Sequence, residues 1–109
     1  CVFCALVGQE LTAGSRVMAA TDDAVALSPY AARWPFEAWV LPRGHHARFE
    51  QAPDTLLAAV GAAVQGLLQR MARRLEQPAL NVVLHSAPYS EAADAAYHWH
   101  LEIVPRVLR

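Results

Sequence analysis

The sequence predicts an α+β fold, in which an antiparallel sheet of about five strands has one long helix packed on one face. Short apolar segments, several of them alternating with polar residues, predict the strands. Residues 53–75 instead repeat apolar side chains at steps of three and four, which predicts a helix. The chain has 109 residues, 55% of them hydrophobic, so we expect one domain over residues 1–109 with a substantial core.

Charge and hydropathy exclude two classes of function. The formal net charge is −1 at pH 7, whereas proteins that bind polymeric nucleic acid usually have a clear basic excess. No apolar run reaches the roughly 18 residues that a membrane span needs, and no basic and apolar leader is visible. We therefore expect a cytoplasmic protein with neither nucleic-acid nor membrane partners. Because the sequence starts at Cys1 rather than Met, we also expect upstream residues in the native chain.

A Cys-x-x-Cys pair, Cys1 and Cys4, opens the sequence. This spacing allows both thiolates to bind one metal ion, and in a cytosolic chain it is more often a metal or redox pair than a disulfide. A redox pair would need a strand before it, and nothing precedes Cys1. We therefore favour a metal site, and we expect a loop over residues 8–15.

Three strands are expected next. Residues 16–21 and 24–28 form a hairpin around a turn at Asp22 and Asp23. Residues 36–41 form the third strand, and a turn with two histidines follows it.

The two histidines of that turn, His45 and His46, are adjacent. Adjacent side chains point in different directions, so at most one of them is a ligand of a given site. Taken alone, both are most simply interpreted as loop histidines in water.

The helix over residues 53–75 has clear signals at both ends. Pro53 suits the first helical position, and Asp54 places an anion near the positive end of the helix dipole. Its apolar stripe consists of Leu56, Leu57, Val60, Val64, Leu67, Leu68, Met71 and Leu75. We expect this stripe, including Val64 and Leu68, to be buried against the sheet.

The end of the chain predicts two more strands. Residues 81–84 form the fourth strand, which leads to His85, and residues 89–96 form a polar, alanine-rich connection. The last strand covers residues 97–106, and its side chains alternate between two faces. The core face carries Tyr97, Trp99, Leu101 and Ile103, and the other face carries His98, His100, Glu102 and Val104.

The second face of this strand has two interpretations. Neighbouring side chains among His98, His100 and Glu102 lie roughly 6–7 Å apart, so two of them can share one metal ion or one phosphate. Alternatively, the strand is half-solvated and these polar residues share no ligand. The residue types alone leave both interpretations open.

Three segments carry a family resemblance. His98, His100 and Glu102, followed by Pro-Arg, resemble a histidine-triad motif, and residues 35–42 and 85–88 match the same branch. Together they look like the C-terminal half of galactose-1-phosphate uridylyltransferases, which carry two histidine-triad-like halves in tandem. The resemblance covers nearly the whole chain and implies a histidine-triad-like sheet.

The resemblance also implies a reaction and its partners. In this family a nucleotidyl group is transferred between a nucleotide sugar and a hexose 1-phosphate, so that UDP-glucose and galactose 1-phosphate give UDP-galactose and glucose 1-phosphate. The middle histidine of the catalytic motif attacks the α-phosphorus and becomes a covalent nucleotidyl-histidine. In the tandem enzymes this active histidine belongs to the first half, whereas this chain resembles the second half, in which His100 holds the middle position. A homodimer or a missing N-terminal half would complete such an enzyme.

Glu102 departs from the catalytic pattern, in which the third position is His or Gln. Both of those residues can donate a hydrogen bond to a phosphate oxygen, whereas an ionised Glu102 only accepts and repels the phosphate. Two alternatives therefore stay open beside a nucleotidyltransferase-type domain. One is a stand-alone histidine-triad nucleotide hydrolase with His100 as nucleophile. The other is a non-catalytic, zinc-bearing half that completes the active site of a partner.

Two metal sites compete under this resemblance. One is a structural zinc site formed by Cys1, Cys4, His45 and His98, which is a complete tetrahedral set. The other uses His85, His98 and His100, with a glutamate from the first half. The presence of both cysteines favours the zinc set, so we expect zinc as the cofactor.

Overall fold

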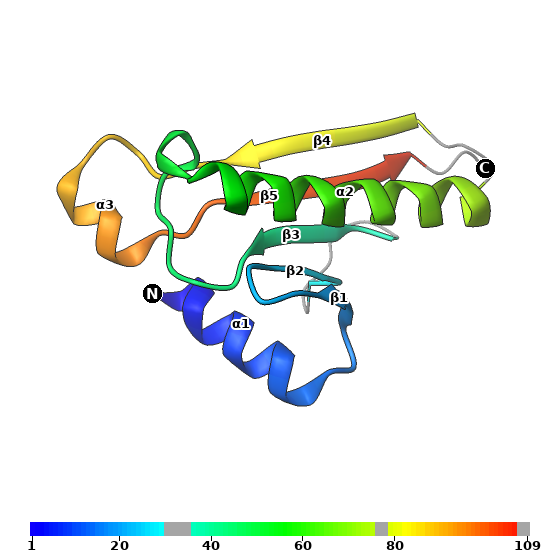
Figure 1. Ribbon diagram of the computed structural model, residues 1–109, viewed down its shortest axis with the longest axis horizontal. Coiled ribbons are helices and arrows are strands. Elements are labelled where there is room, and N and C mark those ends of the chain that lie inside the picture. Colours follow the sequence, from blue (N-terminus) through cyan, green and yellow to red (C-terminus); the bar gives the residue numbers. More distant parts are fainter. Residues whose placement is uncertain (30–35, 76–78, 107–109) are drawn as a thin grey trace.

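The computed structural model describes residues 1–29, 36–75 and 79–106. Five strands form one antiparallel sheet in the order β1-β2-β3-β5-β4. The strands are β1 (Val17–Ala20), β2 (Ala24–Leu27), β3 (Ala38–Pro42), β4 (Ala79–His85) and β5 (His100–Arg106). The helices are α1 (Val2–Ala13), α2 (Asp54–Leu75) and α3 (Glu91–Ala96), and a short 3₁₀ turn, η1 (Phe49–Gln51), precedes α2. The predicted α+β fold, with a long helix on one face of the sheet, is confirmed (Figure 1).

The alternation along the strands gives the sheet two different faces. One face packs against α2 through small and branched residues such as Ala26, Val40 and Ile103. The other face packs against α1 through residues such as Val25 and Leu41. In β2 and β3, neighbouring positions therefore send one side chain toward each helix, as period-two alternation requires.

The long helix α2 lies along the first face, as expected. The row of side chains that it buries is rotated about the helix axis from the predicted row. Leu56, Val60, Leu67 and Met71 are buried. Val64 and Leu68 are only half-buried and lie on the flank of the core. At 3.6 residues per turn, Leu68 lies about a quarter of a turn from Leu67, so the expectation that Leu68 is fully buried is wrong.

The expectation of a loop over residues 8–15 is also wrong, because α1 continues to Ala13. The Cys1 side chain caps this helix by accepting a hydrogen bond from the Cys4 backbone N–H. Gly14 ends it in the left-handed conformation, with φ of 77°, which glycine adopts without steric cost. Val7 is the one apolar residue of α1 that is fully buried, and Leu6 and Leu11 pack beside it. Exposed apolar residues of the same helix, such as Val2, obscure this line in the sequence.

Two boundaries at the end of the chain differ from the prediction. The connection over residues 89–96 contains the short helix α3, which Ser90 caps by accepting from the Ala93 backbone N–H. The last strand begins at His100 rather than at residue 97, because the Trp99 N–H donates to the His46 carbonyl instead of to a neighbouring strand. Helix α3 and the N-terminus therefore lie at the same end of the molecule, near the start of β5 (Figure 1).

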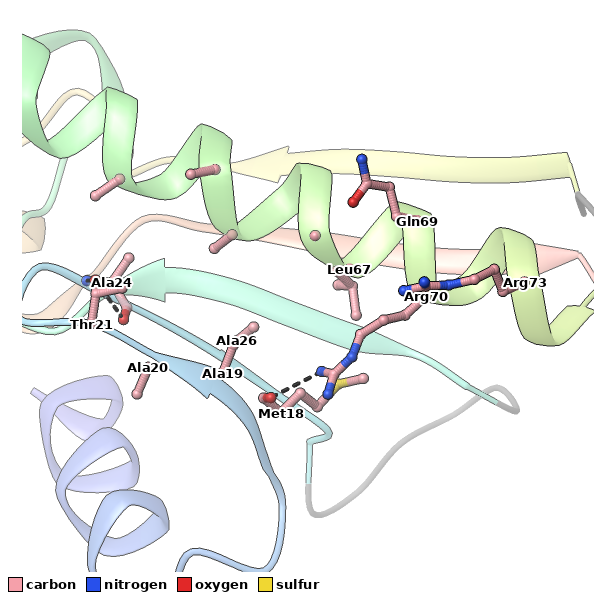
Figure 2. Close-up of a pocket in the computed structure, with 14 residues that line it drawn as sticks. Met18, Ala19, Ala20, Thr21, Ala24, Ala26, Leu67, Gln69, Arg70 and Arg73 are labelled. Atoms are coloured by element: carbon pink, nitrogen blue, oxygen red, sulfur yellow. Dashed lines mark hydrogen bonds between the residues drawn. The ribbon is translucent and has the colours of Figure 1, made fainter.

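A groove of about 450 Å³ separates α2 from the hairpin of β1 and β2 (Figure 2). Small residues on both walls, such as Ala63 and Gly66 on α2 and Ala26 on β2, leave this space. Arg70 closes one end by donating to the Met18 carbonyl at 3.0 Å. None of the predicted site residues lines the groove. No helix among the described residues is long and apolar enough to cross a membrane.

Candidate functional site

Three segments of the chain bring four metal-binding side chains together. Cys1 and Cys4 come from the start of α1, His45 from the turn after β3, and His98 from the residues just before β5. Their sulfur and nitrogen atoms all lie within 4.8 Å of one another. This is the set that the resemblance implied, although 94 residues of sequence separate Cys4 from His98.

Backbone carbonyls orient both imidazoles of this cluster. The Nε2 of His45 lies 2.6 Å from the Asp94 carbonyl oxygen, and the Nε2 of His98 lies 2.7 Å from the Pro42 carbonyl oxygen. A carbonyl oxygen only accepts hydrogen bonds, so each Nε2 carries the proton and each Nδ1 keeps its lone pair. Both Nδ1 atoms face the Cys4 sulfur, at 3.3 Å for His45 and 3.7 Å for His98.

The cluster suits a zinc ion. Bond lengths of 2.3 Å to sulfur and 2.0–2.1 Å to nitrogen place tetrahedral ligand atoms roughly 3.3–3.8 Å apart. The distances from the Cys4 sulfur to the two Nδ1 atoms, 3.3 and 3.7 Å, fall in that range, and all four ligand atoms lie within 4.8 Å of one another. Histidine ligands of zinc usually donate their other N–H to a carbonyl or carboxylate, as both imidazoles do here. Burial also lowers the pKa of His98, so its imidazole is neutral, as a ligand must be.

The competing metal set is not assembled in the same way. His98 directs one ring nitrogen to Cys4 and the other to the Pro42 carbonyl, so neither is left for a site with His85 and His100. The Nε2 of His85 instead lies 3.0 Å from a carboxylate oxygen of Glu102. The geometry therefore favours the cysteine-containing set.

His100 lies two residues after His98, and its two ring nitrogens have the opposite roles from those of His98. Its Nδ1 donates to the His98 carbonyl oxygen at 3.1 Å, which leaves the Nε2 lone pair for another partner. The residue is 5% exposed, and burial lowers the pKa of its imidazole, which the nearby Glu102 carboxylate partly offsets. Near neutral pH, His100 is thus a neutral imidazole whose lone pair is on Nε2.

Aromatic rings surround His100 on several sides. The His85 ring stacks on it with a centroid distance of 4.8 Å and an interplanar angle of 20°. Trp39 lies at 4.8 Å, Phe3 at 5.0 Å and Tyr97 at 6.2 Å from the same ring. These contacts hold the imidazole in one orientation and shield it from water.

The structure changes the electrostatic argument about Glu102. Its carboxylate is 7% exposed and accepts a hydrogen bond from His85, whose ring stacks on His100. The N–H of His85 therefore satisfies one carboxylate oxygen of Glu102 next to His100. The carboxylate at position 102 is thus held by a hydrogen-bond donor of this chain.

Several residues of the site were not predicted. Phe3 stands between the two cysteines, and Trp39 faces Glu102 across β3 and β5. Alternation along residues 36–41 could have placed Trp39 on the polar face, because Trp39 lies two residues after Glu37. In the structure the indole N–H of Trp39 donates to the Glu37 carboxylate. The carbonyls of Pro42 and Asp94 have no sequence signal, because every residue carries a carbonyl.

Comparison with curated proteins gives relatives of known activity. An ADP-glucose phosphorylase from Arabidopsis thaliana is 33% identical over 85 residues, which are 76% of this chain and 24% of the relative. A galactose-1-phosphate uridylyltransferase from Haemophilus influenzae is 27% identical over 104 residues, which are 94% of this chain and 30% of the relative. The chain thus spans about a quarter to a third of the length of these relatives.

Solved structures give the same picture. The Arabidopsis ADP-glucose phosphorylase with bound ADP-glucose superposes with a TM-score of 0.85 and 30% identity, over 97% of this chain and 34% of that one. A member of the HIT family from Bacillus subtilis superposes with a TM-score of 0.76 and 20% identity, over 98% of this chain and 73% of that one, which shows the shared fold. The family model for the galactose-1-phosphate uridyl transferase C-terminal domain matches residues 2–109, and this chain therefore belongs to that family.

Proposed function

We propose that the chain is the zinc-bearing C-terminal half of a nucleotidyltransferase that acts on a nucleotide sugar and a hexose 1-phosphate, with His100 as its nucleophile. The observation that carries this proposal is the hydrogen bond from the Nδ1 of His100 to the His98 carbonyl, which leaves Nε2 as a neutral nucleophile. The substrate class is supported by the relatives, one of which is a phosphorylase with bound ADP-glucose.

The proposed reaction has two steps that reverse each other. The Nε2 lone pair of His100 attacks the α-phosphorus of the nucleotide sugar, and the bond from that phosphorus to the bridging oxygen breaks, which releases a hexose 1-phosphate. A phosphate oxygen of a second hexose 1-phosphate then attacks the nucleotidyl-histidine and regenerates the imidazole. The low pKa that burial gives His100 favours this role, because only the neutral ring is a nucleophile.

Zinc in this proposal is structural. Cys1, Cys4, His45 and His98 would hold it, joining α1 to the turn after β3 and to the start of β5. The ion would keep the segment before His100 in place without contacting the substrate.

A partner surface is also part of the proposal. The edge strand β4 exposes Val82, Val83 and Leu84, of which Val82 is 51% exposed. Uncovered apolar edge strands are rare in proteins that act alone, so we infer that an N-terminal half or a second copy in a homodimer covers β4. Such an enzyme would work in the cytoplasm.

Incubation of the zinc-loaded chain with α-³²P-labelled ADP-glucose or UDP-glucose tests the nucleophile. We expect an acid-labile label on the protein, lost in His100→Ala but kept in the control His46→Ala. Zinc content should be unchanged in both variants. If His100→Ala keeps the label, or if it loses zinc instead, His100 is not the nucleophile.

A second candidate, a non-catalytic zinc-bearing half, is favoured by the carboxylate at position 102. Glu102→Gln distinguishes the two candidates, because it replaces an acceptor with a donor of nearly the same shape. In a catalytic domain the variant should transfer the label faster. If the wild-type chain and Glu102→Gln both stay unlabelled with zinc bound, the chain is a non-catalytic half. Release of the label to water rather than to hexose 1-phosphate would identify a hydrolase.

A further inference from the structure

Phe3 stands between the two cysteines, on the first turn of α1, and its ring contacts the proposed nucleophile. The ring centroid lies 5.0 Å from that of His100 and 5.4 Å from that of Tyr97. It also lies 6.4 Å from Trp39 and 6.4 Å from His98. One side chain at the start of α1 thus touches the rings around the site and the segment that carries a metal ligand.

His100 owes part of its low exposure to this ring. The imidazole is 5% exposed, whereas a nucleophile must be reached by a phosphorus atom. His85 and Trp39 lie in strands of the sheet, and Tyr97 lies between α3 and β5. Phe3 belongs to the first turn of a separate helix, so its ring reaches His100 only when that turn is docked.

Besides the cysteines, the Phe3 ring itself supplies the contacts of this helix end with the rest of the chain. Val7 is the first fully buried residue of α1, and Val2 beside Phe3 is 70% exposed. Cys4 points to His45 and His98, so a metal ion bound there would tie down the same turn that carries Phe3.

We propose that Phe3 is a positioning residue, a metal-anchored cover whose ring sets how far His100 is open to substrate. Metal binding by the cysteines on either side seats the ring against the imidazole, and loss of the metal releases it. The inference rests on the proposed function only for its consequence, namely access of substrate to His100. The cover itself is a property of the folded chain.

Acylation of His100 by diethyl pyrocarbonate measures this cover directly. The rate is followed by fragment mass spectrometry, which separates His100 from His98, at one pH where imidazoles are neutral. Phe3→Ala in the zinc-loaded chain should raise the rate at His100 about threefold to tenfold, as expected for the loss of aromatic contacts. The neighbouring control Val2→Ala should leave the rate unchanged, and Phe3→Tyr, which keeps the ring, should restore the wild-type rate.

A metal chelator completes the test, because the effects of chelation and of Phe3→Ala can be measured separately and together. The cycle is measured at a temperature where circular dichroism shows that the metal-free wild type and metal-free Phe3→Ala are both still folded, because unfolding would expose His100 in either protein. Under that condition, chelation should raise the rate at His100 in the wild type by a similar factor, and in Phe3→Ala it should add little, because both changes remove the same contact. Equal effects of the chelator in both proteins, or an unchanged rate in zinc-loaded Phe3→Ala, would overturn the proposal. Zinc content and circular dichroism check that Phe3→Ala is folded, and Phe3→Leu replaces it if it is not. Because acylation needs no turnover, a chain without transferase activity can still show the cover, so the two proposals fail independently.

Discussion

The two helices that cover the sheet are attached to it in different ways. The 22 residues of α2 present a continuous apolar stripe, with four buried side chains spread over its length. The 12 residues of α1 have one fully buried apolar side chain, Val7, with Leu6 and Leu11 packed beside it, and they are also held at both ends. Cys4 joins the metal-binding cluster near one end, and Glu10 binds Arg16 near the other.

This difference predicts how each helix responds to solution conditions. Hydrophobic packing is spread over many contacts and does not depend on protons or metal ions. A metal cluster depends on metal ions and on protons, and an ion pair depends on protons. We therefore expect α2 to stay packed on the sheet when pH or metal content changes. We expect α1, which carries Phe3 and Cys4, to detach more readily under the same changes.

The largest expected effect comes from Cys4→Ser, which removes a thiolate that faces both imidazoles. Structural zinc contributes on the order of 10 kcal/mol to folding in small sites, so the variant should lose zinc and melt at a much lower temperature. Metal analysis and thermal melting followed by circular dichroism measure both changes. A chelator should lower the melting temperature of the wild type and leave that of the variant unchanged. Wild-type protein that contains no zinc and melts equally in chelator would contradict this prediction.

The next largest effect comes from Leu67→Ala, at the centre of the buried line of α2. Removing a buried leucine typically costs about 2–5 kcal/mol, and we expect that loss in the free energy of unfolding measured by urea titration. Zinc binding should be unchanged, because α2 contributes no ligand. Leu68→Ala is the matched control, and its half-buried side chain should cost clearly less. Equal losses in the two variants would mean that the buried line is placed incorrectly.

The same contrast explains how much of the fold the sequence could predict. Helix α2 was predictable because its stripe repeats over six turns, and the five strands because short apolar segments are bounded by turn residues. Helix α1 was not predicted, because Gly8 interrupts the segment and an exposed apolar residue such as Val2 obscures the side that is buried. Its position depends instead on contacts between residues far apart in the chain.

The site shows a similar limit. The four clustered side chains could be named before the structure, because the resemblance supplied the set that the residues alone left incomplete. The opposite roles of the ring nitrogens in His98 and His100 could not be named. They depend on two carbonyl oxygens, those of Pro42 and His98, and a carbonyl has no identity in a sequence.

A smaller effect is expected at the end of α1, from Gly14→Ala. Gly14 has a φ of 77°, and no atom outside its chain neighbours lies within 4 Å of the position that an added methyl group would take, so only the backbone opposes the change. An alanine held in the left-handed region costs about 1 kcal/mol. Urea titration should show that loss, and Gly66→Ala in α2, with open space and helical φ, should stabilise slightly instead. If Gly14→Ala leaves the free energy of unfolding unchanged, residue 14 is not held in the left-handed conformation.

The smallest effect is expected from Glu10→Gln, and its dependence on pH is the informative part. Two hydrogen bonds from Arg16, at 2.5 and 2.6 Å, hold the pKa of Glu10 below its ordinary value of 4.5. Because the folded state binds this proton less readily than the unfolded state, the carboxylate stabilises the fold above pH 4.5, and its contribution is lost as the pH falls through the lower, folded pKa. The stability difference between wild type and Glu10→Gln, measured by urea titration of proteins with the same metal content, should therefore be full at about pH 7 and shrink toward about pH 3. Added salt should also reduce it, since Arg16 is 37% exposed. A difference that stays constant with pH would show that the ion pair does not hold this end of α1.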